Sequence, residues 1–187
     1  EAYTEVVYMP DLEPNVSFDD QGMFLSLTGE HTLAASAVNL DRVEMYVDRV
    51  YPNNLFYLLS DYHYSLFSEY GYTDSIRYFL GDTIHNEVYE VGGEYNQPQP
   101  IHLDLDEYIP EGEHGIYRVL LKDPEYWDGS QRWVMVTDLG LVAKKGEDDV
   151  MVWVASLDTL APVPGTKVTL LSVQNQVMAE GMTDAQG

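Results

Sequence analysis

The 187-residue sequence contains no cysteine. This absence excludes disulfide bonds, thiol nucleophiles, zinc–thiolate sites and internal thioesters within the chain. It does not exclude an oxidising compartment, because a domain of this size can be stable on its hydrophobic core alone.

Basic residues are scarce. Lys and Arg number 9 against 32 Asp and Glu, which gives a formal net charge of -23. Such a charge repels polyphosphates and anionic membrane surfaces. We therefore expect no nucleic-acid partner and no membrane contact from this chain, and we interpret the charge as a solvated surface that keeps the protein soluble.

Long apolar runs and targeting signals are also missing. No apolar stretch approaches the length needed to span a bilayer, and Glu1-Ala-Tyr-Thr-Glu5 has neither a basic nor an apolar leader region. Because Gly187 follows directly on a turn signal, we expect both ends to be internal to a longer protein. With 45% hydrophobic and 12% aromatic residues, the chain has enough core for one large or two small globular domains.

Turn-forming residues recur at short intervals between runs rich in Val, Tyr, Leu and Thr, as is typical of antiparallel β-sandwiches. In the run 42–50, Val43, Met45 and Val47 alternate with polar or aromatic neighbours that include Asp48, so we predict a strand with one buried face. We predict further strands of this block at 31–38, 83–91, 101–105 and 115–121.

A helical insertion is predicted at about 53–80. Leu55, Leu58 and Leu59 follow helical spacing after Asn53 or Asn54, either of which suits an N-cap. Six tyrosines crowd this insertion, at positions 57, 62, 64, 70, 72 and 78. They suit a glycan or protein contact, and packing against the sandwich explains them equally well.

The best candidate for a domain boundary lies near Gly129. Pro124 and the pair Asp128-Gly129 interrupt two β-rich blocks, which predicts one domain at 1–128 and a second, incomplete one at 129–187. Strands of the second are predicted at 133–142, 150–157, 167–173 and 177–182. We expect three aromatic residues beside the boundary to bury the interface between the domains: Tyr126, Trp127 and Trp133.

Several motifs in this order carry a family resemblance. In the first block they are Asn15-Val-Ser-Phe18, the run 38–50 and Asn54-Leu-Phe-Tyr-Leu-Leu59; in the second they are Val136-Thr-Asp-Leu-Gly-Leu141, Val152-Trp-Val-Ala-Ser-Leu-Asp-Thr159, Pro162-Val-Pro-Gly-Thr-Lys-Val-Thr-Leu170 and Thr183-Asp-Ala-Gln-Gly187. Together they resemble consecutive macroglobulin-like domains of bacterial α2-macroglobulins. The sequence departs from the pattern at Leu160-Ala161, where relatives often have Gly and a basic residue.

The resemblance implies a structural part of a broad-spectrum endopeptidase inhibitor. In that family a bait region is cleaved, the molecule rearranges around the protease, and some members attach it through a thioester. Implied partners are the other domains of the parent chain and, through the full-length parent, target proteases. The implied location is the periplasm or cell envelope, with a lipid anchor elsewhere in the parent as one form of attachment. Neither a bait region nor a thioester is recognisable in this sequence.

An acidic segment offers an alternative function. Its carboxylates suit calcium, but their spacing does not fit an EF-hand loop, and the alternation of the segment predicts Leu103 and Leu105 inward with the acids in solvent. The acids concerned are Asp104, Asp106, Glu107, Glu111 and Glu113. The rival to the trap is therefore a surface or periplasmic module that binds glycan, calcium or a protein partner.

The sequence offers no catalytic constellation. The five histidines show no pair at metal-binding helical spacing, and without cysteine none of them completes a thiol dyad. A hydrolase that uses two carboxylates has the least support, because nothing selects one pair among 32. We accordingly expect no enzyme activity, no cofactor and no metal site.

Overall fold

The computed structural model describes residues 4–5, 10–19, 24–25, 31–59, 76–126 and 129–187. Two sheets form its larger block. One has the strand order β1-β3-β6, with β1 at Asn15–Phe18, β3 at Thr32–Val38 and β6 at Gln99–Asp104. The other has the order β2-β8-β7-β4-β5, with β2 at Phe24–Leu25, β8 at Gly129–Val136, β7 at Gly115–Lys122, β4 at Arg42–Val50 and β5 at Gly81–Glu90.

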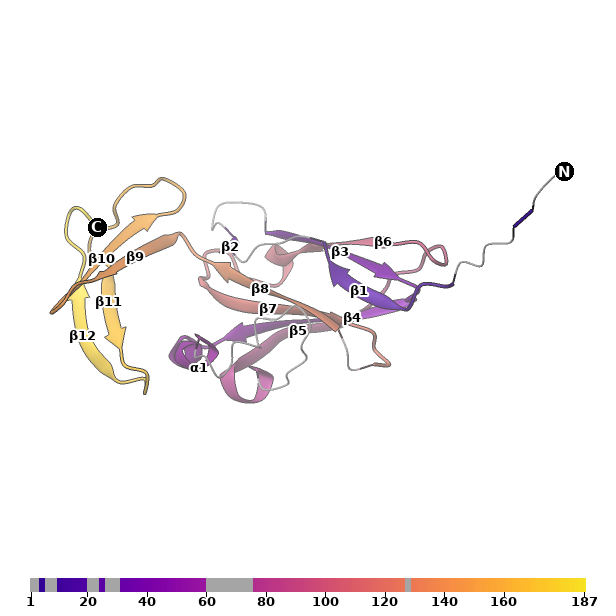
Figure 1. The fold of residues 1–187 in the computed structure, drawn as a ribbon, viewed down its shortest axis with the longest axis horizontal. Helices are drawn as coiled ribbons and strands as arrows, with labels where there is room; N and C mark the ends of the chain where they lie inside the picture. Colours follow the sequence, from indigo (N-terminus) through magenta and orange to yellow (C-terminus); the bar gives the residue numbers. More distant parts are fainter. Residues whose placement is uncertain (1–3, 6–9, 20–23, 26–30, 60–75, 127–128) are drawn as a thin grey trace.

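These two sheets stack face to face (Figure 1). Nearly all their strand pairs are antiparallel, the exception being β2 with β8. Alternating side chains of both sheets point into the space between them, as the period of two in a strand requires. The buried core there includes Ala35, Met45, Val47, Leu103 and Val119. The predicted β-sandwich architecture is therefore confirmed.

Among the described residues, four short helical segments accompany the sheets. They are η1 at Pro52–Asn54, α1 at Leu55–Leu59, the π-helical turn η3 at Ile76–Leu80 and η4 at Leu105–Glu107. The predicted helix is thus present, and its asparagine N-cap stays a prediction. The Asn54 amide donates to the carbonyl oxygens of Phe79 and Leu80, at 3.2 and 3.1 Å, and so ties η1, directly before α1, to η3.

Both faces of the five-stranded sheet are covered. On the face away from the three-stranded sheet, a second apolar cluster joins the sheet to α1 and η3: Val50, Leu58, Ile76, Leu80, Ile116 and Trp133. The expectation that β4 has only one buried face is wrong at Asp48, which is fully buried. Asp48 shares a face with Val50 of this cluster, because strand alternation places Val47 and Asp48 on opposite faces of the sheet.

The smaller block consists of two hairpins. β9 at Leu139–Lys145 pairs with β10 at Val150–Ser156, and β11 at Lys167–Leu171 pairs with β12 at Val177–Met182. Figure 1 shows this block beyond the end of β8. In the described part of the chain, no helix has the length and apolar character needed to cross a membrane.

The strand expected at 133–142 is two separate strands. Strand structure is interrupted at Thr137–Asp138. There the Thr137 hydroxyl accepts from the Leu139 amide at 3.0 Å, and the Asp138 carboxylate accepts from the Ser156 hydroxyl at 2.9 Å. β8 pairs with β7, and Lys122 is the register partner of Gly129. The segment 123–128 therefore joins two strands of one sheet. The two-domain division stays a prediction, and these pairings favour a boundary after Val136 over one near Gly129.

Candidate functional site

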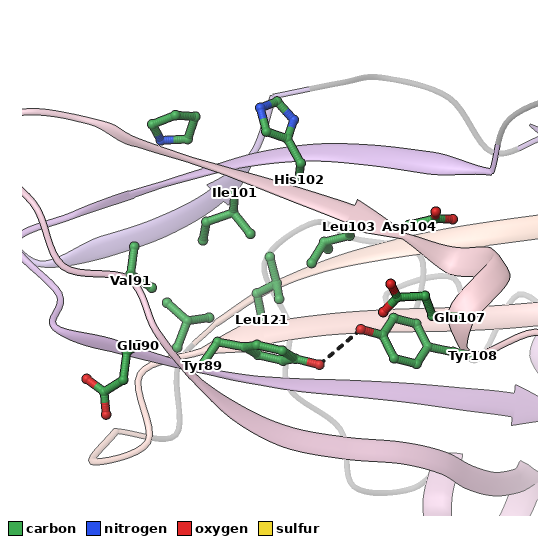
Figure 2. A pocket seen from close by; sticks show the side chains of 12 residues that line it. Tyr89, Glu90, Val91, Ile101, His102, Leu103, Asp104, Glu107, Tyr108 and Leu121 are labelled. Atoms are coloured by element: carbon green, nitrogen blue, oxygen red, sulfur yellow. Dashed lines mark hydrogen bonds between the residues drawn. The ribbon is translucent and has the colours of Figure 1, made fainter.

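The sandwich is closed along one side and open along the other. On the closed side β1 packs against β8, and the Arg132 guanidinium lies 5.4 Å from the centre of the Phe18 ring. On the open side the edge strands are β5 and β6, each of which has a strand partner on only one side among the described residues. A hollow of about 340 Å³ lies between them (Figure 2).

Apolar side chains form the inner wall of this hollow. Val43 and Leu121 come from the five-stranded sheet, Ile101 and Leu103 from β6, and Val91 from the loop that follows β5. Their positions follow from strand alternation, since Ile101 and Leu103 are two residues apart and share the inner face of β6. The wall is therefore continuous with the main core.

Two tyrosines bridge the sheets at the hollow. The hydroxyl groups of Tyr89 on β5 and Tyr108 after η4 lie 3.0 Å apart, as the dashed line in Figure 2 marks. His85 supports both: its Nε2 is 2.9 Å from the Tyr89 hydroxyl, and its ring centre is 4.2 Å from that of Tyr108. These contacts fix both phenol groups at the lining of the hollow.

Burial and neighbouring carboxylates keep these phenols protonated. Burial raises the pKa of Tyr89, and the hydrogen bond to Tyr108 and the charge of Glu87 raise it further. Burial also raises the pKa of Tyr108; its hydrogen bond to Tyr89 opposes this shift, and the Glu107 carboxylate adds to it. Both hydroxyls can therefore donate hydrogen bonds over the physiological pH range.

The charged groups of the hollow are acidic. Glu90 lies at one end and Glu107 at the other, close to Tyr108, with Asp104 on the same side as Glu107 (Figure 2). The lining includes His102 but no Lys or Arg. The hollow thus combines an apolar wall, two phenol groups and a negatively charged rim.

The acidic segment behaves as its alternation predicts. Leu103 and Leu105 are buried, while Asp104 and Asp106 are exposed. Asp104 accepts from the Asp106 amide at 3.0 Å, and the Asp106 carboxylate lies 2.5 Å from Nδ1 of His31. Among the residues with described positions, no three His, Asp or Glu side chains are close enough to hold a metal ion.

Other predicted site residues are dispersed. Tyr126 is 65% exposed, and Trp127 lies outside the described residues. Trp133 is buried in the cluster under α1 and η3, whose members all belong to the larger block. The interdomain role of these three residues stays a prediction. Of the six insertion tyrosines, Tyr57 and Tyr78 are described and exposed, and positions 62, 64, 70 and 72 lie outside the described residues.

Sequence reasoning missed Tyr89 and Tyr108 as a pair. They are 19 residues apart and come from different structural layers, so no local spacing brings them together. The available signal was the alternation of the predicted strand at 83–91, which gives Tyr89 and Glu90 opposite faces. That signal identifies the strand face but not the partner across the gap.

Comparisons with known proteins match residues 17–187 to two consecutive family domains. The model of the bacterial alpha-2 macroglobulin MG2 domain matches residues 17–135, and the model of the bacterial alpha-2-macroglobulin MG3 domain matches residues 136–187. An alpha-2-macroglobulin homolog of Yersinia pestis is 25% identical over 210 residues, which cover 98% of this chain and 10% of the relative. The chain therefore spans about a tenth of the length of the curated relatives it matches.

Solved structures agree on the fold. Native alpha-2-macroglobulin of Escherichia coli spanning domains NIE-MG1 superimposes with a TM-score of 0.69 at 23% identity, covering 95% of this chain and 86% of that one. The trypsin-activated form of the Escherichia coli protein gives a TM-score of 0.68 at 19% identity, covering 93% of this chain and 12% of that one. Likeness at this identity concerns the fold.

Proposed function

Since this chain belongs to the bacterial α2-macroglobulin family, we propose that it forms part of the wall of a protease-trapping molecule and performs no catalysis of its own. Its partners are then the other domains of the parent chain, and proteases are met only through the full-length parent. The parent resides in the periplasm or cell envelope under this proposal.

One observation carries the proposal. The chain resembles the native and the trypsin-activated Escherichia coli structures equally well over nearly its whole length. A segment whose fold is alike before and after activation suits a wall that moves as a unit while other parts of the molecule rearrange. The core of the larger block, covered on both faces of its central sheet, gives that wall its stiffness.

The trap is tested with the full-length parent and trypsin. A caged protease stays active on a small peptide amide but loses activity on a large protein substrate, because only the small substrate passes the wall. We therefore expect the parent to suppress cleavage of the protein substrate alone. Equal cleavage of both substrates with and without the parent would contradict the proposal.

The role of this region is tested separately by amide hydrogen exchange. In the full-length parent, the amides of β4 and β7 should exchange at the same slow rate before and after trypsin treatment, because both strands lie inside the unchanged sheet. A large increase in their exchange on activation would show that the region takes part in the rearrangement. Fractionation of cells that express a tagged parent checks the location.

A further inference from the structure

The hollow between β5 and β6 plays no part in a purely structural role. A volume of about 340 Å³ falls at the lower end of the range for sites that hold a small ligand or one large side chain. The strands that border it have free edges among the described residues, and a free edge pairs readily with an added extended segment.

The lining selects for an elongated cation. Its wall is apolar and suits the aliphatic stem of a Lys or Arg side chain, while the Glu107 carboxylate beside Tyr108 suits the charged end (Figure 2). The rings of Tyr89 and Tyr108 add a surface to which a guanidinium group is attracted. An anionic or purely apolar ligand would leave the Glu107 carboxylate without a partner of opposite charge.

The chain's own cations are occupied elsewhere. Five of its nine basic residues form ion pairs away from the hollow: Arg42 with Glu125, Arg49 with Glu113, Arg118 with Asp48, Lys122 with Glu44 and Lys167 with Glu180. The described basic side chains do not line the hollow. Among the described residues, therefore, no basic side chain fills the hollow.

We propose that the β5–β6 hollow binds an extended basic segment of a partner protein. The segment pairs its backbone with a free strand edge and places one Arg or Lys side chain in the hollow, where its stem covers Ile101 and Leu121 and its charged end meets Glu107. The net charge of -23 attracts such a segment from a distance, so association is salt-dependent. This site is independent of protease trapping.

Three capped tripeptides test the site on this chain. They are Val-Arg-Val, the same peptide with norleucine in place of Arg, and the same peptide with Glu at that position. Titration is followed by NMR shifts of the β5 and β6 amides and of the Tyr108 ring. We expect the Arg peptide to bind, the norleucine peptide to bind at least about fivefold more weakly and the Glu peptide not to bind.

Matched variants separate the site from general acidity. Glu107→Gln removes the carboxylate that meets the charged end, and it should weaken the Arg peptide about two- to fivefold. Glu147→Gln makes the same change in the exposed β9–β10 turn and should leave binding unchanged. Thermal melting of each variant checks that the fold is retained.

Three results would overturn the proposal: equal binding of the Arg and norleucine peptides, equal weakening by Glu107→Gln and Glu147→Gln, or peptide-induced shifts located away from β5 and β6. Failure of the peptide to bind leaves the trap proposal intact, because peptide binding is measured on this chain and trapping on the full-length parent. An Arg peptide that is N-methylated on its central amide tests the strand pairing. If the peptide backbone pairs with a strand edge, the methylated peptide must bind more weakly than the unmethylated one.

Discussion

The buried ion pair of Arg118 and Asp48 gives the sharpest test of the fold. Both side chains are fully buried in neighbouring strands, with Nε and Nη2 of Arg118 at 2.9 and 2.5 Å from Oδ2 of Asp48. The Thr83 hydroxyl donates to the other carboxylate oxygen at 2.6 Å. These three residues are register partners across β5, β4 and β7, so sheet pairing itself brings them together.

Replacing Arg118 alone removes the guanidinium that pairs with Asp48 across β4 and β7. Breaking one side of a buried ion pair is strongly destabilising, so we expect Arg118→Met to lose about 3–5 kcal/mol in the free energy of unfolding. The double variant Asp48→Leu/Arg118→Met removes both charges of the pair, and it should unfold within about 1 kcal/mol of the unsubstituted chain or be more stable. The expected coupling between the two sites is therefore several kcal/mol.

Urea denaturation followed by far-ultraviolet circular dichroism measures these differences, and equal slopes with urea confirm that the same structure unfolds. Arg49→Met, on the neighbouring strand β4, is the matched control. Its guanidinium pairs with Glu113 at 2.9 Å, but the two side chains are 38% and 39% exposed, so the loss should stay below about 1 kcal/mol. The reasoning is refuted if Arg118→Met costs no more than Arg49→Met, or if the double variant is as unstable as the single one.

Three further predictions concern pH and steric fit. Burial alone would raise the pKa of Glu44, but its hydrogen bonds, foremost that from Lys122, outweigh burial and lower the pKa. Glu44 therefore stabilises the fold above its unfolded pKa of 4.5, and this contribution is lost as pH falls through the lower folded pKa. Glu44→Gln should accordingly make stability less sensitive to acid, as measured by urea denaturation at several pH values. The pKa values of Tyr89 and Tyr108 are raised, so these phenols stabilise the fold fully below pH 10 and progressively less above it. Replacing both by Phe should make stability less sensitive to alkali. Ultraviolet difference spectra of that variant should show two fewer tyrosines that ionise late. Gly81→Ala should cost at least about 2 kcal/mol, because a Cβ there would lie 1.8 Å from the Arg49 carbonyl oxygen; an unchanged urea midpoint would show that the β4–β5 pairing is looser than described.

Local patterns predicted most strands of the larger block. The alternation of Val43, Met45 and Val47 identifies both the bounds of β4 and the face that meets the three-stranded sheet. Nothing in that alternation reveals that Asp48 is buried. Its burial depends on α1 and η3 covering the second face of the sheet, a contact between segments far apart in the sequence.

Turn signals were harder to interpret. Pro124 and Gly129 interrupt regular structure equally well in a linker between domains and in a hairpin turn, and only the pairing of β7 with β8 distinguishes the two. The hollow was unpredictable for a similar reason. Its lining combines strand edges from two sheets, and sequence periodicity specifies which face a residue occupies without specifying which edges remain unpaired.

The two blocks differ in how they are stabilised, and this difference bears on every measurement made with the chain. In the smaller block Val154 is the one hydrophobic side chain among the described residues that is buried, while Leu141, Val142 and Met178 are at least 59% exposed. Hydrophobic burial is the main favourable term in folding, so this block contributes far less to stability than the larger one. The unfolding free energies of the Arg118 and Asp48 variants therefore report on the larger block, where both the ion pair and the β5–β6 hollow lie.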